Sequence, residues 1–308
     1  MKRWGEKRYY SLDYYCKSTY GEKLYKVTLN GGMTCPNRDG NIGTGGCIFC
    51  SASGSGDFAG SASLSIPKQL QDGKQQLRQK RPIASFIAYF QAFTNTYGSI
   101  EHLRAVYSDA IADPEVKILS IATRPDCLGD DVLALLDEMN QSKPVWVELG
   151  LQTIHEESAR YIRRGYMLPV FEKAVADLRK LGISVIVHVI LGLPGESREM
   201  IFETIDYLNH RDIQGIKLQM LHVLKDTDLA LNYSKDPFWI PTMQEYVELV
   251  CDCISHLRED IVIHRITGDG PKDLLIAPEW SSRKRTVLNA ISTRLKEMDL
   301  WQSKYESR

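Results

Sequence analysis

Six apolar runs rich in β-branched residues, separated by amphipathic segments, constrain the fold of this chain most strongly. The runs cover residues 23–30, 85–90, 116–122, 145–152, 185–193 and 215–221. Most of them are typical of strands that are buried on both faces. The segments between them carry apolar residues at three-to-four spacing, several behind a Ser, Asp or Pro cap. Repeated strand–helix units predict a parallel sheet covered by helices.

The number and spacing of these runs favour a partial (β/α)6 barrel of the TIM type, although a doubly wound sheet has the same periodicity. The 308 residues, 43% of them apolar, can fill one large α/β domain. From about Leu224 the pattern changes to two helical segments and a short strand at 261–266. We therefore predict a barrel with an N-terminal arm and a cysteine loop over residues 1–223. A C-terminal α/β extension or cap follows over residues 224–308.

Composition narrows the class of protein. The 38 basic and 39 acidic residues leave no overall basic excess, so any nucleic-acid contact must use local patches. The chain has seven cysteines, which is an odd number. Its N-terminus is charged and aromatic and does not resemble a secretory signal. No apolar run approaches the roughly 20 residues of a membrane-spanning helix. We expect a cytoplasmic protein with no membrane partner.

Three cysteines form the strongest chemical signal. Cys35, Cys47 and Cys50 lie in CPNRDGNIGTGGCIFC, directly after the first predicted strand. Thiolates bind iron–sulfur clusters or zinc, and three of them leave one coordination position open for chemistry. A structural zinc site that borrows a histidine or aspartate is the alternative. A phosphate-binding loop is disfavoured, because GNIGTGG lacks both the Gly-Lys-Ser/Thr ending and the following helix.

Polar residues recur where the other predicted strands end. These are Gln91, Thr94 and Asn95, then Thr123, Arg124 and Asp126, then Gln152 and Thr153, His188 within the fifth strand, and Gln219, His222 and Lys225 after the sixth. Ligands of parallel barrels gather at the carboxyl ends of the strands, so this pattern predicts one shared site. His188 could equally be a core histidine, and His222 and Lys225 could be surface groups.

The remaining cysteines are less informative. Cys251 and Cys253 lie two apart on a predicted helix and therefore face different ways, so we interpret them and Cys16 as packing residues. Cys127 follows TRPD near a strand end and could face a substrate. The segment HRITGDGP with Trp280 is our candidate for a cap over the site.

Several motifs together resemble the radical S-adenosylmethionine (SAM) enzymes. They are the cysteine loop, Phe49 immediately before the third cysteine, ELGLQT (148–153) and VILGLPGE (189–196). Within that superfamily the chain is most similar to the branch that contains the Elongator catalytic subunit. The long gap between Cys35 and Cys47 departs from the commonest three-residue gap but is characteristic of this branch.

The resemblance implies a radical SAM barrel that binds one 4Fe–4S cluster through Cys35, Cys47 and Cys50, with SAM on the fourth iron. The residues that it implies for SAM binding are Phe49, Gln91, Thr123, Gln152, Arg164 and His188. Phe49 would border the adenine. The planar guanidinium of Arg164, with its paired N–H donors, suits the methionyl carboxylate. Ala122 stands where many relatives have a glutamate, which removes one expected contact.

The resemblance also implies an activity. Reduction of the bound SAM would give a 5′-deoxyadenosyl radical that abstracts hydrogen from the substrate. The branch acts on tRNA, so we expect remodelling of the C5 side chain of the wobble uridine, from carboxymethylaminomethyl to aminomethyl. The expected partners are tRNA and an electron donor such as flavodoxin or ferredoxin. Residues that act in catalysis beyond the cluster and cofactor ligands, and the oligomeric state, are not predicted.

Other functional classes stay open at the level of the sequence. They are a radical SAM enzyme with a protein or small-molecule substrate, a non-enzymatic iron–sulfur carrier, and a zinc-stabilised RNA-binding protein. The N-terminal segment offers a basic and aromatic mixture that suits RNA or an aromatic packing arm. Its residues of this kind are Lys2, Arg3, Trp4, Lys7, Arg8, Tyr9, Tyr10, Tyr14 and Tyr15.

Overall fold

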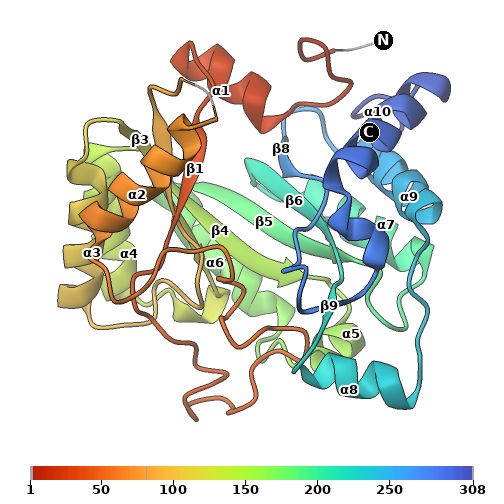
Figure 1. Ribbon diagram of the computed structural model, residues 1–308, viewed down its shortest axis with the longest axis horizontal. Coiled ribbons are helices and arrows are strands. Elements are labelled where there is room, and N and C mark those ends of the chain that lie inside the picture. Colours follow the sequence, from red (N-terminus) through yellow and green to blue (C-terminus); the bar gives the residue numbers. More distant parts are fainter. Residues whose placement is uncertain (1–2, 81, 307–308) are drawn as a thin grey trace.

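The computed structural model describes residues 3–80 and 82–306, and a curled parallel sheet forms its centre (Figure 1). The strand order is β1-β2-β3-β4-β5-β6-β8, and every neighbouring pair is parallel. This is the half-barrel architecture that the sequence predicts, and the six predicted strands supply its first six strands. Their bounds agree with the prediction to within two residues.

The main sheet contains β1 (Tyr25–Leu29), β2 (Phe86–Phe90), β3 (Val116–Thr123), β4 (Val145–Gln152), β5 (Ser184–Leu191), β6 (Gly215–Met220) and β8 (Val262–Arg265). A separate antiparallel pair joins β7 (Val223–Leu224) to β9 (Leu275–Ala277). The helices are α1 (Leu12–Tyr20), α2 (Ile66–Arg78), α3 (Ile100–Ala112), α4 (Asp130–Ser142), α5 (Glu156–Tyr161), α6 (Leu168–Lys180), α7 (Arg198–Asn209), α8 (Asp228–Lys235), α9 (Met243–His256) and α10 (Lys284–Glu297).

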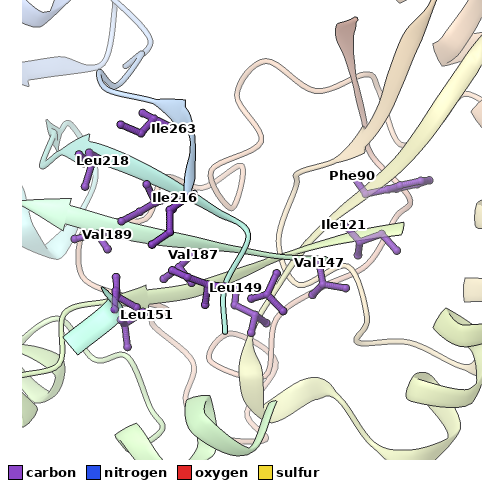
Figure 2. Packing of buried hydrophobic residues seen from close by; sticks show 14 of the residues in the cluster. Phe90, Ile121, Val147, Leu149, Leu151, Val187, Val189, Ile216, Leu218 and Ile263 are labelled. Carbon is purple, nitrogen blue, oxygen red and sulfur yellow. The ribbon is translucent and has the colours of Figure 1, made fainter. Parts of the chain in front are cut away.

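The outer face of the sheet packs against helices and forms the main core. Along β4, Val147, Leu149 and Leu151 point to this face, and Val187 and Val189 of β5 lie beside them (Figure 2). Side chains alternate between the faces of a strand, so the residues in between must point into the barrel. The amphipathic helices supply the other half of this core through apolar stripes at three-to-four spacing.

The amino ends of the strands are closed by the N-terminal arm. Ile118, Trp146 and Ile186 point into the barrel and pack with Cys16 of α1, and Tyr15 contacts Trp146 edge-on with ring centroids 5.9 Å apart. Trp4 and Tyr9 are also buried. Figure 1 places α1 at the end of the sheet opposite the cysteine loop. These contacts favour the packing interpretation of the arm over RNA binding; Lys2 lies outside the described residues.

The C-terminal region contributes to the main sheet. The short strand expected at 261–266 is β8, which pairs with β6 as the seventh strand, so the sheet is one strand larger than the predicted six. Helices α9 and α10 pack side by side, and Cys251 and Cys253 are buried as predicted for packing residues. The division at residue 223 stays a prediction. Within residues 3–80 and 82–306, the structure contains no helix long and apolar enough to cross a membrane.

Candidate active site at the carboxyl ends of the strands

The cysteine loop between β1 and α2 is fixed by hydrogen bonds to itself and to the segment after α5. The backbone N–H of Cys50 donates to the carbonyl of Cys47 over 3.0 Å, which makes the CxxC a tight turn. Ile48 N–H donates to Ile162 O over 3.2 Å, and the Asn37 side chain donates to Arg163 O over 2.8 Å. The loop is therefore held over the ends of the strands.

Gly46 allows the loop to approach Arg38 closely. It has a φ of 71°, and a Cβ added there would lie 2.9 Å from Arg38 Nε. The Arg38 guanidinium in turn donates to the carbonyls of Cys50 over 3.1 Å and Ser51 over 2.6 Å. A glycine at this position lets one arginine bind two successive backbone carbonyls, that of the third cysteine and that of the residue after it.

All the residues predicted to bind the cluster or SAM line one cavity. Its walls include Cys35, Cys47, Cys50, Phe49, Gln91, Thr123, Gln152, Arg164 and His188, which come from the loop and from β2, β3, β4 and β5 with their flanking segments. Their individual roles stay predictions, but the structure brings them together as the strand-end argument requires.

The contacts of the predicted SAM-binding residues differ in kind. Phe49 packs in an apolar cluster with Ile48 and Ile190, as a flat ligand such as adenine requires. Gln91 donates to Ser55 O over 2.6 Å. Gln152 has a positive φ of 69°, a conformation that costs free energy and is frequent at functional sites. The hydroxyl of Thr123 lies 2.6 Å from that of Thr96.

Arg164 is buried and already occupied by protein acceptors. Its guanidinium donates to Leu151 O over 3.1 Å, Thr153 O over 2.7 Å and Tyr166 O over 3.0 Å, and it pairs with Glu156 over 3.3 Å. These bonds join the end of β4 to the loop after α5. A contact of Arg164 with the SAM carboxylate remains a prediction, and the bonds that the structure shows are those of a positioning residue.

A charged network forms the floor of the cavity. The carboxylate of Glu148 on β4 is fully buried and accepts hydrogen bonds from Lys26 over 2.6 Å, Ser120 over 2.7 Å and His188 Nε2 over 2.7 Å. It also pairs with Lys217, whose Nζ donates to the hydroxyl of Tyr89 over 3.0 Å. Five strands besides β4 thus each supply one group to a single polar layer inside the barrel.

This network shifts the ionisation of its members. Burial acts to raise the pKa of Glu148, but the positive charges of Lys217 and Lys26 and the hydrogen bond from His188 hold it well below its usual range. Burial and the neighbouring Lys217 lower the pKa of His188 to about 4. Burial lowers the pKa of Lys217, whereas the carboxylate of Glu148 acts to raise it and pairs directly with the ammonium, so we treat Lys217 as charged within this pair. At neutral pH Glu148 is charged and His188 is neutral.

The three thiols fit an iron–sulfur cluster better than a single ion. Among the described residues, no three His, Cys, Asp or Glu side chains converge on a point where one ion could bind. Three thiols that line one cavity can instead each bind a different iron. Asn37 Nδ2 lies 3.6 Å from Cys47 Sγ, a donor of the kind that stabilises cluster sulfurs. Burial raises the pKa of the Cys47 thiol to about 12, so metal binding there must release a proton.

Of the other residues considered from the sequence, Thr94, Arg124 and Gln219 also line this cavity, whereas Cys127, Lys225 and Trp280 do not. Cys127 lines a neighbouring hollow with Asp126 and Tyr97. The Lys225 ammonium donates to Asp273 O over 2.8 Å. The indole of Trp280 donates to Pro241 O over 3.0 Å.

Glu148, Lys217 and Arg265, which also lines the cavity, are functional candidates that the sequence reasoning did not single out. The signal was a charged residue inside an otherwise apolar strand, as in VWVELGLQ and GIKLQM. A buried charge needs a partner, so such residues in neighbouring strands predict each other.

A half-barrel with three thiols facing a cavity at the carboxyl ends of its strands defines a radical SAM enzyme. Residues 37–208 match the Radical SAM superfamily, and residues 213–297 match the Radical_SAM C-terminal domain. The chain belongs to the radical SAM superfamily. Its cofactors are accordingly a 4Fe–4S cluster and SAM, and the zinc-protein and electron-carrier alternatives are set aside.

Within the superfamily the chain is similar to the uncharacterized protein YtqA of Bacillus subtilis (strain 168), with 45% identity over 98% of this chain and 94% of that protein. Protein YhcC of Escherichia coli (strain K12) is 35% identical over 90% of this chain and 89% of its own length. A tRNA uridine(34) acetyltransferase of Methanocaldococcus jannaschii is 26% identical over 51% of this chain but only 29% of its own length.

The fold has a solved counterpart. The archaeal Elp3 of Methanocaldococcus infernus, with residues 1–46 deleted, superposes with a TM-score of 0.69 and 17% identity, covering 91% of this chain and 64% of that one. At this identity the match shows a shared fold. It confirms the resemblance to the Elongator branch at the level of architecture.

Proposed function

We propose that this radical SAM enzyme acts on tRNA, where it converts the carboxymethylaminomethyl group at C5 of the wobble uridine to aminomethyl. The observation that carries the proposal is the cavity that joins the three thiols to a charged floor at the strand ends. The similarity of about half of the chain to tRNA uridine(34) acetyltransferases supports tRNA as the substrate.

The cofactors supply hydrogen-atom abstraction at a substrate carbon when they are bound. Removal of hydrogen from the carbon between an amine and a carboxylate is favourable, because both neighbours stabilise the product radical. Transfer of one further electron to an iron–sulfur or flavin acceptor, loss of a proton and hydrolysis would then release the two-carbon unit as an aldehyde.

The residues of the chain hold and shield this chemistry. We assign the cluster to Cys35, Cys47 and Cys50, and SAM to the surfaces of Phe49, Gln91 and Gln152. Arg38 fixes the backbone at the third cysteine through the carbonyls of Cys50 and Ser51. Thr123, Arg164 and His188, predicted to contact SAM, also line the cavity, and the bonds of Thr123 and Arg164 within the protein support a positioning role for these two residues.

An exposed aromatic residue at a second hollow supports binding of unpaired bases. Phe58 is 57% exposed and lines a hollow that adjoins the cysteine cavity. The hollow also includes His222 after β6 and, from the C-terminal region, Gly268 and Asp269. Unpaired RNA bases stack on such aromatic rings. We therefore propose that residues 224–308 form the cap of the substrate site.

The proposal includes a reducing compartment and an electron donor. Free cysteines and a reduced cluster require a reducing environment, so we place the protein in the cytoplasm. A flavodoxin or ferredoxin would supply the electron. A radical SAM reaction on a protein or small molecule is the second candidate.

The experiment compares the tRNA nucleosides of a deletion strain with those of its parent and of the strain complemented with wild-type or Cys47→Ser protein. Loss of the protein should accumulate carboxymethylaminomethyluridine and deplete aminomethyluridine, and only wild-type protein should reverse the change. An unchanged nucleoside profile would refute tRNA as the substrate and favour the second candidate.

A further inference from the structure

The cysteine cavity continues into the second hollow, and Arg265 stands at the junction. Gln91, Gln219 and Arg265 line both spaces, whereas none of the three cysteines lines the second one. The junction is therefore the place where a group that enters from the second hollow meets the cofactor cavity.

Three residues form a row across adjacent strands at this junction. His188 of β5 pairs in register with Lys217 of β6, and Lys217 pairs with Arg265 of β8. Neighbouring strands lie about 4.8 Å apart, so the backbones of His188 and Arg265 are about 10 Å apart. Their side chains can bracket a group of a few atoms between them.

The row is cationic at one end. Lys217 and Arg265 line the cavity from β6 and β8, and Lys217 shares the carboxylate of Glu148 with Lys26 of β1. Among residues 3–80 and 82–306, the polar contacts of the Arg265 guanidinium are long, 3.4 Å to Gln219 Oε1 and 3.8 Å to Asp269 Oδ2. Asp269 is also bound by Lys284 over 2.5 Å. The planar guanidinium of Arg265 has weak contacts within the protein and lies beside an excess of positive charge. Such a group is suited to binding a carboxylate.

The other end of the row offers an acceptor. His188 Nε2 lies 2.7 Å from the anionic Glu148, which can only accept, so Nε2 carries the ring proton. The Nδ1 atom of the neutral ring is then a bare acceptor. His188 lines the cavity, so Nδ1 is available to a donor such as the N–H of an amine.

We propose that the junction is a subsite for an N-substituted glycine, in which Arg265 binds the carboxylate and His188 Nδ1 accepts the N–H of the amine. The inference rests on the proposed function, because carboxymethylaminomethyl is such a group, and it explains how the enzyme distinguishes its substrate from the aminomethyl product. Lys217 lies between the two anchors and adds positive charge on the carboxylate side.

The test compares two tRNAs as ligands of the reconstituted enzyme, one with carboxymethylaminomethyluridine and one with aminomethyluridine at the wobble position. The ratio of the two dissociation constants measures how much the carboxylate contributes to binding. Arg265→Gln should raise the dissociation constant of the first tRNA at least tenfold and bring the ratio close to one, with the affinity for the second tRNA unchanged. His188→Gln should weaken binding of both tRNAs, because both carry the amine.

Arg285→Gln, at an exposed position outside the cavity, is the matched control and should behave as wild type.

A folding defect would weaken both tRNAs equally and leave the ratio intact, so the ratio reports the subsite. Turnover by the wild-type enzyme with an unchanged ratio in Arg265→Gln would overturn the subsite and leave the proposed function standing. No turnover of the first tRNA by the wild-type enzyme would instead overturn the proposed function, and the subsite with it.

Discussion

Glu148→Gln tests the charged floor of the barrel directly. The substitution keeps the size of the side chain and one acceptor oxygen but removes the carboxylate that binds both Lys26 and Lys217. Removing one partner of a buried ion pair costs about 3–5 kcal/mol, because the other charge stays buried without compensation. We expect the free energy of unfolding in guanidinium chloride to fall by about this amount.

The matched control is Glu138→Gln, which removes the carboxylate of a surface pair with Arg104. Such exposed pairs contribute less than about 1 kcal/mol. Adding Lys217→Met to Glu148→Gln removes one of the unpaired cations and should recover part of the loss. Equal stability of Glu148→Gln and Glu138→Gln would refute the assignment of a buried ionic network.

The pH dependence gives the same prediction a second readout. Since the pKa of Glu148 is lowered by folding, its contribution is complete above the unfolded-state pKa of about 4.3 and is lost as the pH falls through the folded-state pKa. The difference in unfolding free energy between wild type and Glu148→Gln should therefore hold from about pH 7 to pH 5 and shrink at lower pH. A difference that is unchanged down to pH 3 would contradict a charged Glu148.

Three further predictions concern the cavity. In Gly150→Ala the new Cβ would lie 3.0 Å from Gln152 Nε2, so it should displace that amide and weaken SAM binding severalfold in equilibrium dialysis; unchanged affinity would remove Gln152 from the SAM site. Asn37→Ala removes the N–H beside Cys47 Sγ and should make the cluster potential more negative in a redox titration followed by electron paramagnetic resonance, whereas an unchanged or higher potential would argue against this donor. Phe58→Ala should cost about 1–3 kcal/mol of tRNA binding if a base stacks there. The control is Trp239→Ala, an exposed aromatic residue outside both hollows. Equal affinities of the two variants for tRNA would exclude the stacking role.

The sequence predicted the strands because each is a β-branched apolar run, and it predicted the cluster ligands because three thiols at this spacing leave one position open. Long-range features were less accessible. The pairing of β8 with β6 joins residues that are far apart in the chain, such as Gly215 and Val262, and no local pattern encodes it. The acceptors of Arg164 are backbone carbonyls whose positions depend on the turn after α5, where Arg163 has a φ of 54°.

The charged floor of the barrel could be predicted from the sequence only in part. Lys26, Glu148 and Lys217 each interrupt an apolar strand, which is visible in the sequence. Their convergence on one point depends on the curl of the sheet, which turns alternate residues of separate strands toward each other. Charged residues inside buried strands therefore identify the polar layer of such a barrel before its geometry is known.

The central claim is that Cys35, Cys47 and Cys50 hold a cluster that activates SAM. The most direct measurement is anaerobic reconstitution with iron and sulfide, followed by iron analysis and assay of 5′-deoxyadenosine after reduction with SAM present. We predict a brown protein with about four irons per chain that forms 5′-deoxyadenosine, loss of both properties in Cys47→Ser, and retention of both in Cys127→Ser, whose thiol lies outside the cavity. A colourless protein with one zinc, or an intact cluster that leaves SAM uncleaved, would contradict the account.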